Sequence, residues 1–484
     1  MSASSASSRP GAARSPFRGR ALGLGVVLLV LLGTAVLLFR QAHPPLPIPV
    51  PVQLGTLDIQ VRDYLTSLAR KVADAPVDSE RRIDLGLAFA VNGLWPEARQ
   101  CFLDAGRLGS KGPLPALYAA VALQEIGDAK GALTELRDLV RRHSESAAAW
   151  YRLGHLLATM GEFDEAAAAY ETVTRLAPNE WRGWAGLGEA RLRGGRREDA
   201  VSSLEKAVKL DPYARSARHV LSQALRAVGR TAEADREAAA GKAQTLGPMP
   251  DDWSLRALAH MKGLPDQFEQ SDQLLGQGEE AAAIRLLEDA RRYHPTNTAV
   301  LRRLALAYLA GGRAEEATSL VAAALQRLPN DVGLILAASE TAAATGRAED
   351  ALLLSRRALE LAPRLAEAHV AEANALLANE RDAEAADALN RALELDPRNT
   401  TLLLQLGDLL VVNLGKARAA MDHYVRVLDL DPIHPAALER LAGFHLRDQE
   451  WESAAEMIAR LRALDPSNPT VHRLEKVLTT SRPQ

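Results

Sequence analysis

Residues 150–178 read WYRLGHLLATMGEFDEAAAAYETVTRLAP, two apolar-patterned segments separated by Gly161. Apolar residues recur at helical spacing in both halves, at Leu153, Leu156, Leu157, Ala166, Tyr170 and Val173. A glycine that can adopt the left-handed conformation ends a helix readily, and Pro178 fits just past a helix end, where its missing N–H costs nothing. The stretch therefore predicts two amphipathic helices joined by a short turn.

The same pattern returns along most of the chain. Eleven alanines mark it, at Ala98, Ala132, Ala166, Ala200, Ala234, Ala283, Ala317, Ala351, Ala385, Ala420 and Ala454. Each step is 34 residues, apart from one of 35 and one of 49. A fixed period of this length is typical of a solenoid, in which one supersecondary unit is stacked many times. We therefore expect an all-α protein of about eleven helix-turn-helix units.

Two further positions keep the same phase. A small residue stands twelve positions before the alanine in all units but one, as at Gly86, Gly154 and Gly188, and eight units carry proline twelve positions after it. This pattern resembles the tetratricopeptide repeat (TPR) family, whose motif is met best by Trp150, Leu153, Gly154, Ala166, Tyr170 and Pro178. The resemblance covers roughly residues 79–468. It implies a right-handed α-solenoid and a protein-binding scaffold, but no particular chemistry.

The period and the composition together predict eight segments. They are a cytoplasmic N-terminal tail (1–20), a transmembrane signal-anchor helix (21–39), a proline-rich linker (40–56), a lead-in helix (57–78), a first array of five repeats (79–248), an inserted helix or junction (249–263), a second array of six repeats (264–468) and a C-terminal capping helix (469–484). We interpret the insertion as a helix wedged between two stacked units. A hinge between two arrays with separate partners is the alternative.

The segment Ala21–Phe39 is uncharged and mostly apolar. As a helix it would span about 28 Å, close to the hydrocarbon thickness of a bilayer. Four arginines precede it and one follows closely, so the positive-inside rule places the N-terminus in the cytoplasm and the repeats outside it. We expect a single-pass protein of the inner (cytoplasmic) membrane with a periplasmic or extracytoplasmic repeat region. Secretion after cleavage near Gly33-Thr34-Ala35 and an inverted topology are the alternatives.

The linker that follows alternates proline with apolar residues from Pro45 to Pro51. Such a sequence favours an extended polyproline conformation, so we expect a semi-rigid spacer between membrane and solenoid. A ligand for an SH3-like domain is the alternative function.

Composition excludes several classes of function. The formal net charge of −3 argues against a nucleic-acid binder, and the single cysteine, Cys101, excludes an internal disulfide or a CxxC element. No P-loop, dinucleotide fingerprint, HExxH or GxSxG motif is present. We therefore expect a protein that is not an enzyme, with no cofactor, no metal and no small-molecule substrate, whose partners are proteins or peptides.

The resemblance also implies where partners bind. In the family the first helices line a concave surface, and the exposed groove positions lie three before and one after the small residue. Here the candidates are Tyr151, His155, Arg182, Glu189, Arg193, His219, Gln223, Arg226, Asn374, Leu404 and Asp408. The first groove is mixed and mildly basic, and the second is more apolar and acidic. The alternative is that these residues only form a solvated face.

The carboxylate-clamping Lys/Asn/Arg set of co-chaperone members is missing, since Ile83, Leu87 and Leu117 occupy such positions. We expect a membrane-anchored interaction scaffold that assembles a cell-envelope complex. A non-catalytic substrate-recognition subunit of an envelope transferase or protease is the alternative. Within the groove, Tyr151, Arg182 and His219 are expected to carry partner binding without contributing to stability.

Overall fold

The computed structural model describes residues 46–52, 54–244 and 246–481. All regular elements in these ranges are helical: the short 3-10 helix η1 (Leu54–Thr56) and twenty-five α-helices. The expected membrane segment 21–39 lies outside the described residues. Among those described, no helix combines the length and the apolar character needed to cross a bilayer.

The helices pair as the repeat period predicts. The first array comprises α3 (Ser79–Val91), α4 (Trp95–Arg107), α5 (Leu114–Ile126), α6 (Ala129–Arg142), α7 (Ala147–Met160), α8 (Phe163–Leu176), α9 (Trp181–Arg193), α10 (Arg197–Leu210), α11 (Arg215–Ala227) and α12 (Thr231–Ala240). The second comprises α14 (Leu264–Gly276), α15 (Glu280–Tyr293), α16 (Thr298–Ala310), α17 (Ala314–Arg327), α18 (Val332–Ala344), α19 (Ala348–Leu361), α20 (Ala366–Ala378), α21 (Asp382–Leu395), α22 (Thr400–Val412), α23 (Ala417–Leu430), α24 (Pro435–Arg447) and α25 (Trp451–Leu464). Outside the arrays lie α2 (Ile59–Asp74), α13 (Asp252–Leu258) and α26 (Pro469–Ser481). The prediction of an all-α solenoid of eleven hairpins is thus confirmed.

The repeated small residues explain why the hairpins pack so closely. All eleven period-marking alanines are completely buried. At the facing position on the first helix, a Cβ added to Gly188 would lie 2.4 Å from Leu204 Cγ, and one added to Gly407 would lie 2.5 Å from Tyr424 Cε1. These distances are below van der Waals contact. The small residues therefore set how near the two backbones come.

The turns within the hairpins use the left-handed conformation. Gly161 has a φ of 87°, and the N–H of Glu162 donates back to Leu157 O at 2.9 Å, which closes the end of α7. Glu380 and Gln449 adopt the same conformation in the α20–α21 and α24–α25 hairpins, with φ of 59° and 62°. Glycine is therefore favoured at this turn but not required.

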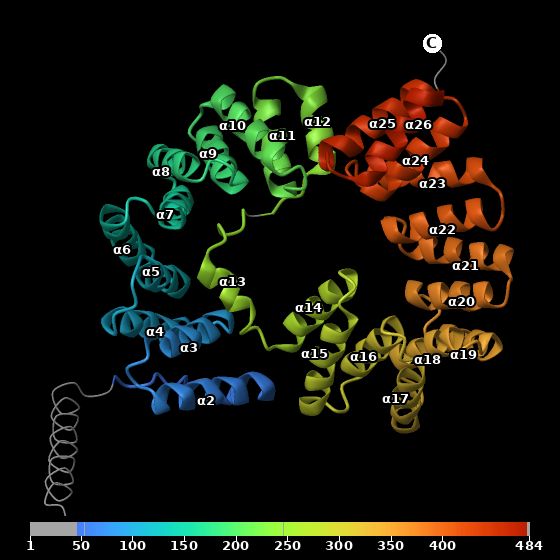
Figure 1. Cartoon of the computed structure of the whole chain (residues 1–484), viewed down its shortest axis with the longest axis horizontal. Coiled ribbons are helices and arrows are strands. Elements are labelled where there is room, and N and C mark those ends of the chain that lie inside the picture. The colour runs from blue at the N-terminus through green and yellow to red at the C-terminus, as the bar shows by residue number, and fades with distance from the viewer. Residues whose placement is uncertain (1–45, 53, 245, 482–484) are drawn as a thin grey trace, which may run out of the picture.

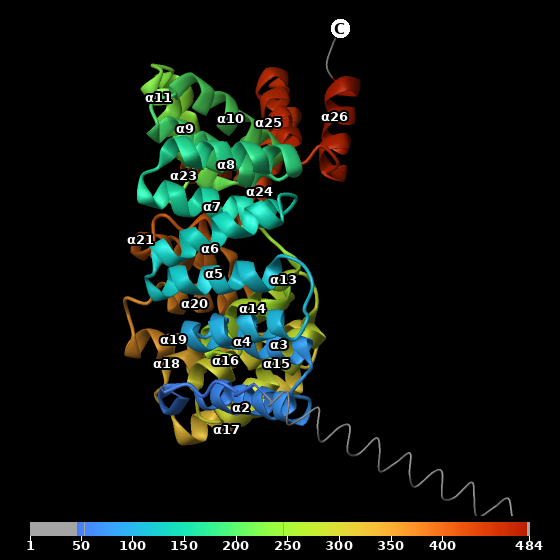
Figure 2. The same ribbon diagram turned by 90° about the vertical axis from the view of Figure 1, so that its left-hand side faces the viewer.

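The two arrays face each other and close into a ring (Figure 1). At one junction α2 meets the start of the second array, where Gln60 Nε2 donates to Asp289 Oδ2 at 3.2 Å. At the other junction α12 and the start of α11 face α23–α25, and Arg215 pairs with Asp431 at 2.6 Å. Figure 2 shows the arrays as two walls, one behind the other. The ring thus joins the lead-in helix α2 to the first unit of the second array, and the fifth unit of the first array to the last two units of the second.

The expectation of a helix wedged between two stacked units is wrong. Helix α13 contacts α3 and lies inside the ring against the concave side of the first array (Figure 1). The physical reason is Trp253, which is 7% exposed and whose ring centroid lies 5.5 Å from that of Phe102 and 5.3 Å from that of Tyr118. The apolar side chains of the inserted residues therefore pack on the concave face of the first array and not between two neighbouring repeat units.

The proline-rich segment is predicted to be a semi-rigid spacer, but its described part is docked on the repeats. Residues 46–52 lie against the first repeat unit, where Arg82 Nη1 donates to Pro47 O at 2.8 Å and Nη2 donates to Leu46 O. Arg82 is completely buried and also pairs with buried Asp104 at 3.3 Å. These two carbonyls and Asp104 accept hydrogen bonds from the terminal nitrogens of the buried guanidinium, while its Nε has no hydrogen-bond partner.

Packing at the helix crossing generates a first prediction. Gly407→Ala places a methyl group against the Tyr424 ring, and overpacking of this kind costs about 1–3 kcal/mol, more than the gain in helix propensity. We expect unfolding at a lower urea concentration and a lower temperature, both measured by circular dichroism. Gly443→Ala is the matched control, because its added Cβ meets no atom within 4 Å, and it should stabilise α24 by about 0.5–1 kcal/mol. Equal effects of the two substitutions would contradict this account of the crossing.

Candidate functional site

The concave face of the first array is covered over its first three units by its own chain. We call residues 241–263, between α12 and α14, the connector. Its main anchor is Trp253, which lies between Phe102 and Tyr118. Asp251 Oδ1 accepts a hydrogen bond from Tyr118 Oη at 2.9 Å and also caps α13 by accepting from the N–H groups of Trp253 and Ser254. An aromatic anchor with polar partners at its rim is the usual arrangement of a bound peptide.

Ionic contacts hold the far end of α13. Arg256 Nε donates to Asp84 Oδ1 and its Nη1 to Glu80 Oε2, both at 2.7 Å. His260 Nδ1 lies 2.8 Å from Tyr64 Oη, which ties the connector to α2 as well. Burial alone would raise the pKa of the Asp84 carboxyl, but the hydrogen bonds from His260 and Arg256 lower it below its usual value. Asp84 is therefore charged at neutral pH and pairs with Arg256.

Tyr151 lies under the connector. It is 1% exposed, its hydroxyl donates to Gly247 O at 2.8 Å, and its ring stacks edge-on against Tyr170. The expectation that Tyr151 serves partner binding without contributing to stability is wrong, because its polar atom and its ring are already used within the fold. Tyr151 lies on the concave side as expected, but the connector covers it.

Beyond Tyr151 the groove opens into a cavity. This groove cavity has a volume of about 540 Å³ and lies between α7, α9 and α11. Its lining includes five predicted residues: His155, Glu189, Arg193, His219 and Gln223. Gln244 and Leu246 of the connector close one side of it. Three successive first helices thus bring side chains that are far apart in sequence to one site.

The groove cavity offers both donors and acceptors. Glu189 pairs with Arg193 at 3.3 Å along α9, and His219 Nε2 lies 2.9 Å from Gln223 Nε2 along α11. Burial lowers the pKa of His155, and the charge of Arg152 lowers it further, so its imidazole is neutral at pH 7. The site is therefore suited to polar side chains and peptide groups, not to one strongly charged ligand.

The remaining predicted residues of the first array lie outside the groove cavity. Arg182 pairs with Glu180 at 2.8 Å and lies 4.7 Å over the Trp181 ring. Arg226 pairs with Asp235 at 2.9 Å. The structure gives both arginines partners within the chain.

In the second array the predicted residues have different environments. Asn374 is exposed, Leu404 is half-buried against the core, and Asp408 accepts two 2.6 Å hydrogen bonds from Arg440 Nε and Nη2. Tyr424 Oη also donates to Asp408, at 2.7 Å. Burial would raise the pKa of Asp408, but hydrogen bonds from Arg440 and Tyr424 lower it. Asp408 therefore joins α22 to α23 and α24, which is a role in stacking.

A second cavity of about 520 Å³ lies between the first helices of the second array. Its walls include Arg302, Glu340, Val370 and Gln405, on α16, α18, α20 and α22. Burial raises the pKa of Glu340. Arg302 is not among the predicted groove residues, although it stands three positions before the small residue Ala305 and the same spacing rule would have found it.

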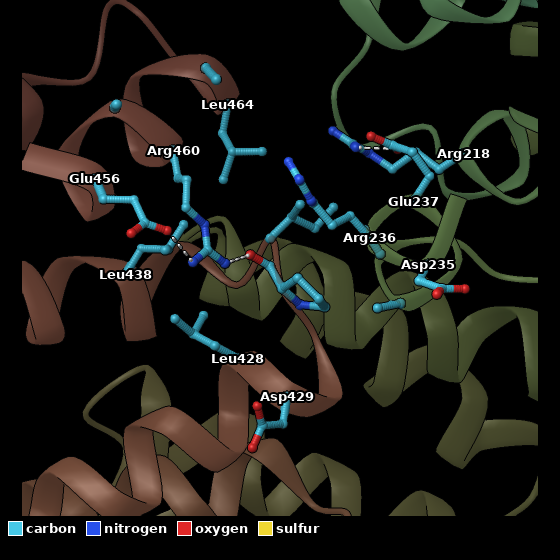
Figure 3. A pocket seen from close by; sticks show the side chains of 16 residues that line it. Arg218, Asp235, Arg236, Glu237, Leu428, Asp429, Leu438, Glu456, Arg460 and Leu464 are labelled. Carbon is cyan, nitrogen blue, oxygen red and sulfur yellow. Dashed lines mark hydrogen bonds and ion pairs between the residues drawn. The ribbon is translucent and has the colours of Figure 1, made fainter. Parts of the chain in front are cut away.

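A further cavity of about 1010 Å³ lies at the junction of α12 with α23–α25 (Figure 3). Arg218 pairs with Glu237 on one wall at 2.7 Å, and Arg460 Nη2 donates to Pro432 O on the other at 2.7 Å. Arg236 extends from α12 toward the opening. This cavity lies where the ring closes, away from the concave faces.

Metal chemistry finds no support in the described part of the chain, where no three His, Cys, Asp or Glu side chains gather as ligands. Cys101 is buried beside Phe102, and desolvation raises the pKa of its thiol to about 12. A thiol with so high a pKa is not a nucleophile at neutral pH.

Stacked helical hairpins with polar side chains along a concave face define a repeat-built interaction scaffold. Tetratricopeptide repeat family models match residues 119–159 and 151–215, and a second such model matches residues 274–339 and 412–478. The chain belongs to the tetratricopeptide repeat family. Proteins of this family are generally non-catalytic and bind proteins or peptides.

Individual relatives share limited parts of the chain. Seventy residues are 34% identical to the cell division cycle protein 27 homolog of Caenorhabditis elegans, which is 14% of this chain and 9% of that protein. The chain thus matches about a tenth of the length of that curated relative.

Among solved structures, YrrB, a TPR protein with an unusual peptide-binding site, is 19% identical and covers 39% of this chain and 97% of its own, with a TM-score of 0.30. PilF of Pseudomonas aeruginosa is 16% identical over 43% of this chain and 95% of its own, with a TM-score of 0.33. MamA of Desulfovibrio magneticus RS-1 is 21% identical over 34% and 92%, with a TM-score of 0.27.

The environment of Tyr151 generates a second prediction. Tyr151→Phe removes the hydrogen bond to Gly247 O, and the loss of one neutral hydrogen bond costs about 0.5–1.5 kcal/mol. We expect a lower melting temperature and faster proteolysis within the connector, measured by mass spectrometry of the first fragments. Tyr213→Phe is the control, because Tyr213 is 45% exposed and no hydrogen bond holds its hydroxyl. Unchanged cleavage of the connector in Tyr151→Phe would show that this contact does not hold it.

Proposed function

We propose that this protein is a membrane-anchored scaffold that binds a peptide segment of a partner in the groove cavity, and so helps to assemble a cell-envelope complex. The observation that carries the proposal is the convergence of His155, Glu189 and His219 from three successive first helices on one open cavity. Concave sites with a few convergent polar groups are where ligands bind most often.

The polar groups in this cavity favour a peptide over a small charged ligand. Glu189 and Arg193 offset each other, while His219 and Gln223 present side-chain nitrogens and an amide oxygen. A peptide backbone carries both donors and acceptors, so it can use such a mixed wall along its length. The apolar side of the cavity, which includes Leu246, can take an aliphatic or aromatic side chain of the same peptide.

Membrane anchoring is the second part of the proposal. It is supported by the apolar segment 21–39 and by the arginines that precede it. The docking of residues 46–52 on Arg82 leaves few residues between that segment and the first repeat unit. A scaffold with this arrangement would hold its partner close to the membrane surface. A substrate-recognition subunit of an envelope transferase or protease would use the same cavity, and the identity of the partner separates the two roles.

A crosslinking experiment tests the cavity. A photoreactive amino acid in place of Gln223, in the full-length protein, should capture a partner when cells are irradiated. The same residue in place of Lys206, exposed on the second helix α10, is the matched control and should capture much less. Adding Arg193→Glu to the protein that carries the photoreactive residue at position 223 should reduce the yield of crosslinked partner, because it reverses a charge on the cavity wall. Equal capture at both positions, or no effect of Arg193→Glu, would refute binding at this cavity.

Fusions test the topology. A phosphatase joined after Gln484 should be active, and a fluorescent protein that matures only in the cytoplasm should stay dark. Leu29→Arg should release the protein from the membrane fraction, since a charge at mid-bilayer costs about 2.5–3.5 kcal/mol on insertion scales. Leu29→Ile is the control and should be retained. A fluorescent fusion protein together with an inactive phosphatase fusion would show the inverted topology. A mature N-terminus beyond residue 35, found by N-terminal sequencing, would show cleavage instead of anchoring.

A further inference from the structure

The connector occupies the groove of the first three units in the way that a separate peptide would. Helix α13 has seven residues and touches the array through one side. Trp253 is buried on that side, while Leu255 and Leu258 on the other remain 61% and 57% exposed. Within α13, Trp253 is the one buried side chain. Elsewhere in the connector, Leu246 and His260 are also buried against the array.

The contacts of the connector have the chemistry of recognition. The Trp253 ring lies between Phe102 and Tyr118, and the carboxylate of Asp251 accepts from the Tyr118 hydroxyl. Five positions after Asp251, the guanidinium of Arg256 reaches two carboxylates, those of Glu80 and Asp84. The groove thus provides an aromatic pocket with an acidic patch beyond it, and the connector fills both.

The repeat stack does not depend on the connector for its own continuity. From α3 to α12 the neighbouring helices pack on one another directly, and α13 adds to this a contact with α3. The chain between α12 and α13 forms no helix in its described residues. Apart from the backbone hydrogen bond from Lys242 N–H to Arg215 O at 3.0 Å, next to α12, the connector is held through side chains, and it can leave without breaking a helix pair.

We infer that the groove over α3, α5 and α7 is a second peptide site, specific for a short helical segment with Asp, Trp and Arg at positions i, i+2 and i+5, and that the connector is a resident copy of this ligand. The inference rests on the proposed function, since it assumes that the concave face binds partners. Tethering gives the resident copy an effective concentration in the millimolar range, so a partner segment has to bind well or arrive at high local concentration.

Displacement of the connector would also change the groove cavity. Gln244 and Leu246 form one side of that cavity, and Gly247 is held by Tyr151. When the connector leaves, the groove becomes continuous from α3 to α11. Occupation of the second site thus enlarges the site of the proposed function.

The test uses the full-length protein in detergent and a fluorescein-labelled peptide with the sequence of residues 249–262, MPDDWSLRALAHMK. The wild-type protein should bind the peptide weakly, because its own copy competes. The variant Trp253→Ala with Arg256→Ala should bind it on the order of 100-fold more tightly, measured by fluorescence anisotropy. Leu255→Ala is the matched control on the exposed side of α13 and should behave as wild type. A peptide with alanine in place of its tryptophan should not bind any of the proteins.

A second variant keeps the test independent of folding effects. Two protease sites, one after Gly247 and one after Lys262, both cut in the folded protein, separate α13 from the chain on either side without changing any anchoring side chain. Cutting should allow the labelled peptide to exchange into the groove. If the double variant retains its melting temperature and the cut protein stays assembled, yet neither takes up the peptide, the connector is a structural strut and the inference is wrong. If the photoreactive residue at position 223 captures no partner but the labelled peptide binds to the variants described here, partner binding in the groove cavity is refuted. The peptide site over α3, α5 and α7 is then still supported.

Discussion

The structure depends on one steric constraint, repeated eleven times: the two helices of each hairpin cross where one of them carries almost no side chain. Gly188 against Leu204 and Gly407 against Tyr424 show how little room there is, since a single added carbon would overlap the facing side chain. Because a small residue recurs at each crossing with nearly the same period, the first helices come into line. That alignment brings His155, on α7, and His219, on α11, to one cavity although 64 positions separate them in the sequence.

The repeat pattern predicted the hairpins well because its causes are local. Buried alanines, turn glycines and trailing prolines act within about thirty residues, so their spacing indicates the fold directly. The pattern was less informative where another residue type fills the same role: Glu380 adopts the left-handed turn conformation without being glycine. Five of the residues that the family resemblance implied for the groove line the groove cavity.

What could not be predicted is what lies on that face. The insertion was evident from the 49-residue step, but its position depends on Trp253 meeting Phe102 and Tyr118, more than 130 positions away. No local signal encodes that pairing, and it changes the role of Tyr151 from a free groove residue to a buried one. Likewise, Asp408 has the right periodic position, yet Arg440 on the first helix of the next unit engages it. Charge partners across units are a tertiary property.

The buried guanidinium of Arg82 has a mechanical consequence. By bonding to the carbonyls of Leu46 and Pro47 it closes a loop that contains α2 and joins the first described residues directly to α3. Tension applied to the chain ahead of Leu46 would pass through this clamp and the Asp104 pair into the repeat stack. Helix α2, although it comes earlier in the sequence than α3, would lie outside the path of the force. Its contact with α15 would therefore stay unstrained, so the ring would keep its shape while the protein is pulled from that end.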